Sequence, residues 1–178
     1  LYDDTFVRLI MGDQYVNETL ANIDKGDPMA IYKGMSQGNM FSLITVNNIY
    51  VSFVCFAMGI LFSFGTGYML FTNGVMVGAF QCFFYTKGVL LQSALVIWIH
   101  GTLEISAIVI AGCAGLTMGN SILFPGTYSR GVSFVRGAKQ GVKIIVGLVP
   151  VFIVAGFLES FVTRYSNMPM WLSLLIIG

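Results

Sequence analysis

Two ionisable side chains, His100 and Glu104, stand four residues apart inside an otherwise apolar stretch. In a helix this spacing places an imidazole and a carboxylate on one face, where they can share a proton or a hydrogen bond. Ionisable groups are costly in hydrocarbon, so such a pair within a membrane helix favours a functional role. The structural alternative is that Glu104 bonds to backbone groups exposed at a helix break and that His100 is a satisfied interfacial side chain.

Other charged residues are expected near this pair. Lys87 interrupts one apolar stretch, whereas Glu159 and Arg164 lie at the end of another. Adjacent antiparallel helices place the start of one level with the end of the next, so Glu159 and Arg164 should lie near His100 and Glu104. We therefore predict a functional polar cluster that consists of Lys87, His100, Glu104, Glu159 and Arg164.

Enzymatic chemistry finds little support in the residues. With one His, the chain has no HExxH zinc site, and it has no GxSG setting of a serine protease. Cys55, Cys82 and Cys113 lie in apolar segments without CxxC spacing, which is typical of buried small side chains. We expect no enzyme activity and no catalytic, cofactor-binding or metal-binding residues. An intramembrane enzyme that uses Glu104 is a minor alternative.

The composition indicates a membrane protein. The 178 residues are 56% hydrophobic and 10% charged, whereas soluble domains carry about 25% charged residues. No Asp, Glu, Lys or Arg occurs from Gly34 to Thr86. A bilayer core takes about 20 apolar residues per helical span, so this composition predicts an all-α, polytopic transmembrane bundle. The net charge of +1, without a basic stripe, argues against nucleic acid as a partner.

The chain is expected to have two regions. Residues 1–48 contain five Asp among regularly spaced apolar side chains, which predicts amphipathic, interfacial helices, the second starting after Asp27-Pro28. Residues 49–178 should form the transmembrane domain. Its expected elements are spans near 49–71, 102–124 and 142–162, and the start of another span at 170. The last residues are apolar, so we expect the sequence to be part of a longer protein.

Residues 74–99 are the ambiguous part of this domain. Lys87-Gly88 divides them into two arms, each too short to cross a core of about 30 Å. We therefore expect a re-entrant helical hairpin, with a single tilted span as the alternative. If the hairpin does not cross, the Lys and Arg residues place both 1–48 and the loop 125–141 in the cytoplasm, at a bacterial inner membrane.

Small residues recur at every fourth position in several apolar segments. Such stripes let helices approach closely in lipid, either within one chain or in a dimer. The predicted packing positions are Gly59, Ser63, Gly67, Gly74, Gly78, Ala107, Ala111, Gly115 and Gly119. Pro150 should kink the span near 142–162, because it cannot bond to the carbonyl of Val146.

Several of these features resemble the stage II sporulation protein M family. They are Asn47-Asn48 before a Gly-rich segment, Asn73-Gly74 followed by Gly78, and His100-Gly101 with Glu104 and the small residues after it. The likeness covers about residues 39–162. It implies a multi-span inner-membrane protein; the family is named for a member that works with two peptidoglycan-degrading partners during engulfment of the forespore.

These considerations lead to two functional hypotheses. The first is a membrane scaffold or complex subunit linked to cell-envelope processes, which contacts lipid, other envelope proteins or a second copy in a dimer. The second is a transporter or channel that uses the polar break around Lys87, His100 and Glu104, since broken helices and buried polar groups are found in transporters.

Overall fold

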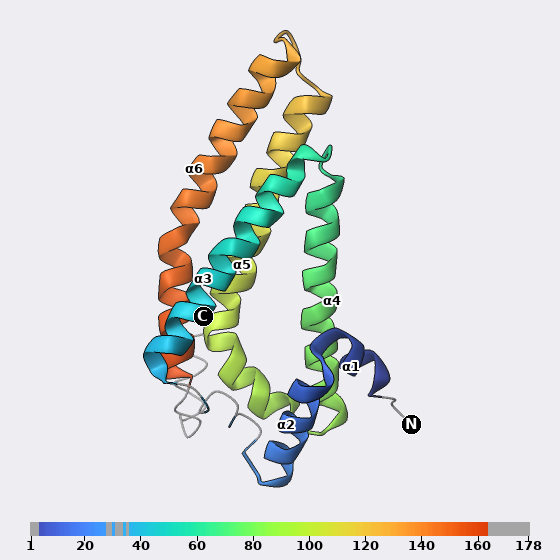
Figure 1. Ribbon diagram of the computed structural model, residues 1–178, viewed down its shortest axis with the longest axis vertical. Helices are drawn as coiled ribbons and strands as arrows, with labels where there is room; N and C mark the ends of the chain where they lie inside the picture. Colours follow the sequence, from blue (N-terminus) through green and yellow to red (C-terminus); the bar gives the residue numbers. More distant parts are fainter. Residues whose placement is uncertain (1–3, 28–29, 31–33, 35, 164–178) are drawn as a thin grey trace. The chain divides into compact units, whose positions relative to one another are not determined.

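The computed structural model describes residues 4–27, 30, 34 and 36–163 (Figure 1). All regular secondary structure in these residues is helical, as expected for an all-α protein. In order, its α-helices are α1 (Thr5–Met11), α2 (Asp13–Asp24), α3 (Gln37–Ala57), α4 (Phe64–Thr86), α5 (Leu90–Leu123) and α6 (Arg130–Phe157). A 3-10 turn, Met58–Ile60, extends α3, and a π-helical turn, Leu158–Val162, extends α6. The further span predicted from residue 170 lies outside the described residues.

The chain forms two compact units, whose boundaries fall within helices α3, α4 and α5 and at the end of α6. Unit 1 consists of Leu1–Phe41, Asn73–Thr102 and Phe157–Gly178, and unit 2 consists of Ser42–Thr72 and Leu103–Gly156. The boundary predicted at residue 48 therefore falls inside unit 2. Each unit is described separately below.

In unit 2, helices α3 and α5 run parallel and in constant register. Asn48 contacts Glu104 across 56 residues of sequence, and Gly59 faces Gly115 at the same separation. Helix α6 runs antiparallel to α5, since Gly137 near its start faces Ser121 near the end of α5. Helix α5 therefore packs against helices on more than one side, which explains its many small residues.

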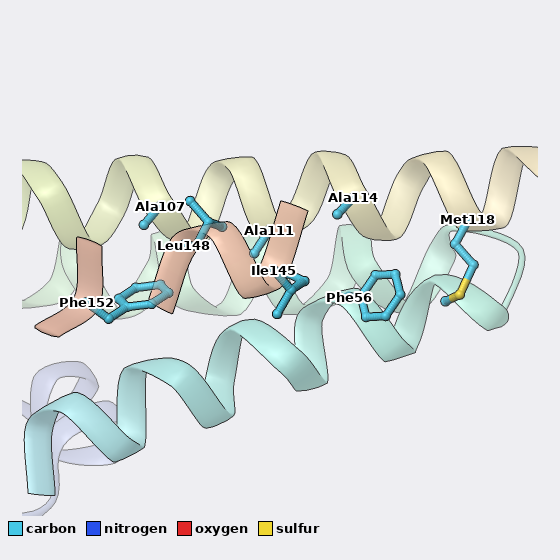
Figure 2. Packing of buried hydrophobic residues seen from close by; sticks show 8 residues of the cluster. All are labelled: Phe56, Ala107, Ala111, Ala114, Met118, Ile145, Leu148 and Phe152. Atoms are coloured by element: carbon cyan, nitrogen blue, oxygen red, sulfur yellow. The ribbon is translucent and has the colours of Figure 1, made fainter. Parts of the chain in front are cut away.

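The core of unit 2 combines small side chains of α5 with large ones of α6 and α3. Figure 2 shows alanines along one face of α5 opposite the larger apolar side chains. The buried members are Phe56, Ala107, Ala111, Ala114, Met118, Ile145, Leu148 and Phe152. Because alanine leaves room for an aromatic or branched partner, the helices can pack closely without voids.

Unit 1 has a second apolar cluster, which joins α1 and α2 to parts of α4 and α5. Its buried residues are Val7, Val16, Phe83, Phe84 and Val96. Helices α1 and α2 meet at Gly12, whose φ of 85° is readily adopted by glycine. Arg8 bridges the two helices through hydrogen bonds to Asp13 and Asn17, at 3.1 and 2.8 Å.

Three helical segments of the described chain are long and apolar enough to cross a membrane: Gln37–Ile60, Leu90–Leu123 and Arg130–Val162. Between 28% and 33% of the residues in their apolar windows are buried inside the protein. Most of this apolar surface therefore faces outward, and a hydrocarbon solvent accounts for it better than water does. The prediction of a membrane protein agrees with this surface.

The predicted span 49–71 has wrong boundaries. One helix runs from Gln37 to Ala57, so the expected helix near 28–46 and the start of that span form a single element in the described part. The chain then turns at Leu61–Ser63, where Phe62 and Ser63 have φ values of 51° and 70°. Neither residue is glycine or proline, which explains why the sequence gives no turn signal there.

The turn at Lys87-Gly88 lies where it was predicted, with Gly88 at φ 74°. The arms beside it, however, belong to longer helices: α4 has 23 residues and α5 has 34. Asn73-Gly74 lies within α4. At about 1.5 Å per residue, α4 is about 35 Å long, which is enough to cross a bilayer core.

The other predicted spans begin too late. Helix α5 starts at Leu90 instead of near 102 and ends at Leu123, just before the predicted break at Pro125-Gly126. Helix α6 starts at Arg130, twelve residues before the predicted Val142. Charged residues led us to expect a loop there, but Arg, Lys, Gln and Ala are good helix formers.

The directions of the helices in unit 2 bear on the predicted sidedness. Because α3 and α5 are parallel, Asn48 and Glu104 lie at one end of the unit, and the loop 124–129 lies at the other. An even number of crossings between residue 48 and this loop does not fit that arrangement. The expectation that 1–48 and 125–141 share one side assumed that residues 74–99 do not cross.

Candidate functional site

His100 is the most deeply buried ionisable residue of the predicted cluster. It is 3% exposed and lies in the part of α5 that belongs to unit 1. Its Nε2 lies 3.7 Å from Oε1 of Glu159, and its Nδ1 lies 3.1 Å from Oγ1 of Thr163. A carboxylate and a hydroxyl near opposite ring nitrogens fix the orientation of the imidazole.

The π-helical turn Leu158–Val162 positions Glu159. A π-helical turn contains an extra residue relative to an α-helical turn, so the side chains around it point in new directions, and such turns are often found at functional positions. Glu159 and Ser160 are both buried in this turn. The predicted proximity of Glu159 to His100 is therefore seen in unit 1, whereas Arg164 lies outside the described residues.

Tyr15 of α2 lies near the same carboxylate. The pKa of Tyr15 is raised to about 12, mainly by burial; a hydrogen bond with Thr19 lowers it and the negative charge of Glu159 adds a smaller increase. The phenol is thus neutral at physiological pH and able to donate a hydrogen bond. The sequence gives no signal for this contact, because nothing in the spacing of α2 relates Tyr15 to residue 159.

Lys87 is located at the turn between α4 and α5, where it pairs with the N-terminal region. Its Nζ lies 3.0 Å from Oδ2 of Asp4 and 5.7 Å from the centre of the Phe83 ring. Both side chains of the ion pair are about a quarter exposed. The negative charge of Asp4, 83 residues earlier in the sequence, thus offsets the positive charge of Lys87, which is unfavourable in lipid.

Glu104 has a different partner in unit 2. Nδ2 of Asn48 donates a hydrogen bond to Oε1 of Glu104, which joins α3 to α5. Thr45 and Ser52 lie one turn away from Asn48 on the same buried side of α3. Their hydroxyl oxygens have no hydrogen-bond partner among the described residues. The buried side of α3 is therefore partly polar. In the sequence, the Asn47-Asn48 pair is the main indication of this.

The predicted polar cluster thus comprises three described pairs. His100 with Glu159, and Lys87 with Asp4, belong to unit 1. Glu104 with Asn48 belongs to unit 2. Such pairs can hold helices together, and a buried His–Glu pair can also bind and release a proton.

The predicted packing stripes differ in their surroundings. A Cβ on Gly59, Gly115 or Gly119 would collide with backbone of a neighbouring helix, whereas a Cβ on Gly67, Gly74 or Gly78 would meet nothing within 4 Å. Ala107 and Ala111 are buried, and Ser63 faces Gly119. Additional close approaches occur at Gly112, Gly137, Gly141 and Gly156.

Pro150 lies inside helix α6, which continues past it to Phe157.

The family comparison covers most of the chain. The family model described as "Stage II sporulation protein M" matches residues 6–164. The matched residues include every member of the three pairs except Asp4, and they extend over parts of both units. No significant match to this chain was found among curated proteins or among solved structures.

Proposed function

Because the chain belongs to the stage II sporulation protein M family, we propose that it is a non-enzymatic scaffold or complex subunit of the bacterial inner membrane. In this role it brings together proteins that act on the cell envelope. The observation that carries the proposal is the backbone-level packing inside unit 2. Gly59 meets the backbone of Gly115, and Gly119 meets that of Gly59 and Ser63, so helices α3 and α5 leave no room between them at these levels.

The outward surface supports the same role. Large aromatic side chains are exposed along α4, among them Phe64, Tyr68, Phe71 and Tyr85. Gly67, Gly74 and Gly78 share that helix and have open space at the Cβ position. In lipid, helices associate through small residues that allow close approach, so α4 suits a partner helix from another protein or from a second copy.

A photo-cross-linking experiment in native membranes tests this proposal. A photoreactive residue at Phe71, which is 69% exposed, should cross-link to a second copy or to a small set of envelope proteins. The matched control is the same residue at Val154 of α6, which is 51% exposed and lies on a different helix. If both positions gave only lipid adducts, the scaffold proposal would be wrong.

A transporter or channel is the second candidate. The buried His100 and the partly buried Glu104 of α5 favour it, because polar groups inside membrane helices often mark substrate or proton pathways. Glu104→Gln removes the charge but keeps an oxygen that can accept a hydrogen bond from Asn48. A transporter should lose ion or proton flux in proteoliposomes with this variant, whereas a scaffold should show no flux in either form and unchanged cross-linking.

We further propose that α3, α4, α5 and α6 each cross the inner membrane once. The loop 124–129, next to a helix start rich in Lys and Arg, then lies in the cytoplasm, and residues 4–27 lie on the opposite side. Single cysteines at Tyr128 and Lys25, in a variant without Cys55, Cys82 and Cys113, should react with an impermeant maleimide from opposite faces of oriented vesicles. Labelling of both from one face would refute this topology and support the re-entrant hairpin.

A further inference from the structure

The first four turns of α6 carry basic side chains on their outward face. Arg136, Lys139 and Lys143 are all exposed and lie within one side of the helix. The opposite side is fixed by burial, since Ser133, Gly137 and Gly141 face the interior of unit 2. The packing of α6 therefore directs the three cations away from the interior of unit 2.

Acidic partners for these cations are missing from the described part of unit 2. The sequence contains no Asp or Glu from Ile105 to Leu158. Within the described residues of unit 2, the only acidic side chain is Glu104, which bonds to Asn48 at the far end of the unit. The positive charge of this face is therefore available to a negatively charged ligand from outside the chain.

Apolar side chains alternate with the cations on the same face. Val132, Val135, Val142 and Val146 are between 42% and 57% exposed. Tyr128 is also half exposed, and the Arg136 guanidinium lies over its ring, 4.5 Å from the centre. A ligand that covers this face must therefore offer anionic groups and apolar surface side by side.

The position along α6 matches the membrane surface. From Lys143 to Val162, the end of the apolar segment, the helix rises about 29 Å, close to the thickness of a hydrocarbon core. Arg136 and Lys139 then lie at the level of the headgroups, and Lys143 can extend its amine toward them. Tyr is also enriched at this level of membrane proteins.

From these observations we infer that the outward face of α6 from Val132 to Val146 binds anionic phospholipids. The phosphodiester headgroup pairs with Arg136, Lys139 and Lys143, and the acyl chains cover the valines. Phosphatidylglycerol and cardiolipin both have this chemistry. A nucleic acid or an inorganic phosphate would neutralise the cations but leave the valines exposed, so neither fits as well. This inference stands independently of the scaffold proposal, because it concerns lipid alone.

Lipid binding to the purified full-length protein in detergent tests the inference. Phosphatidylglycerol should be retained in native mass spectra about 100-fold more strongly than phosphatidylcholine. The triple variant Arg136→Gln, Lys139→Gln, Lys143→Gln should bind it about 100-fold more weakly, since each cation near an anionic surface contributes a several-fold gain. Lys25→Gln, which removes an exposed cation just after the end of α2, is the control and should bind like wild type. Cardiolipin, tested alongside, distinguishes the two headgroups.

Three results would overturn the inference. One is equal retention of the anionic and the zwitterionic lipid by the wild-type protein. Another is unchanged retention by the triple variant. The third is that inorganic phosphate alone displaces the lipid, or that the triple variant loses a cross-link to an acidic protein instead of losing lipid. If the triple variant fails to fold, Lys139→Gln replaces it and should bind phosphatidylglycerol several-fold more weakly than wild type. The preference of the wild-type protein for phosphatidylglycerol over phosphatidylcholine should also fall as the salt concentration increases.

Discussion

Gly115→Ala should destabilise the protein by about 3 kcal/mol, near the upper end of the usual cost of overpacking. An added Cβ at this position would meet Oγ1 of Thr66 and the backbone oxygens of Cys55 and Phe56. The carbonyl groups belong to α3 and cannot move without shifting that helix. Because a collision with backbone is not relieved by a change of rotamer, the helices must separate and lose their contacts along the whole interface.

Gly67→Ala and Gly78→Ala are the matched controls. Both glycines lie within α4, and a Cβ at either position would meet nothing within 4 Å. Alanine has the better helix propensity, by about 1 kcal/mol per residue, so these variants should be unchanged or slightly more stable. The free energy of unfolding, measured by denaturant titration in mixed micelles, compares all three. Equal stability of Gly115→Ala and Gly67→Ala would show that α3 and α5 do not pack in the described register.

Sequence reasoning predicted the helical class and the sharp turns that glycine marks. Lys87-Gly88 and Pro125-Gly126 both lie between helices, and both glycines have positive φ. The turn at Leu61–Ser63 gave no such signal, because Phe62 and Ser63 adopt left-handed conformations that side chains normally disfavour. Missing this one turn shifted the first span by about half its length and concealed the start of α4 at Phe64.

Helix starts were harder to predict than helix ends. Between Gln37 and Ala57 no charge or proline interrupts the chain, so the polar Asn47-Asn48 pair was taken as a boundary. In the structure Asn48 lies inside the helix, because a hydrogen bond to Glu104 satisfies its amide. A polar residue within an apolar helix can therefore mark a tertiary partner instead of an end.

The candidate site was predictable only where chain direction fixes neighbours. Antiparallel packing of consecutive helices was enough to place Glu159 near His100, and their side chains lie 3.7 Å apart. The partner of Lys87, Asp4, is 83 residues away and belongs to the N-terminal region, whose position no periodicity determines. The pairing of Asn48 with Glu104 depends on the register of two parallel helices separated by α4, which sequence spacing does not provide.

A double-mutant cycle on Asn48 and Glu104 should show a coupling free energy of about 1–2 kcal/mol, above the average of about 0.6 kcal/mol for hydrogen bonds between membrane helices, because the acceptor is a carboxylate. Glu104→Leu leaves the Asn48 amide without its acceptor, and Asn48→Leu leaves a partly buried carboxylate without its donor. The second loss should be the larger, about 3 kcal/mol, because an unpaired charge costs more than an unpaired amide. The double variant has neither orphan group and should be more stable than the sum of the single losses implies.

Glu104→Gln separates charge from hydrogen bonding in the same cycle. It keeps an acceptor for Asn48 and should lose less stability than Glu104→Leu. The matched control is Asn17→Ala, which removes the hydrogen bond to Arg8 on the exposed side of α2 and should change stability by no more than about 0.5 kcal/mol. Strict additivity of Asn48→Leu and Glu104→Leu would mean that the two side chains do not interact, and that the parallel register of α3 and α5 lacks its polar anchor.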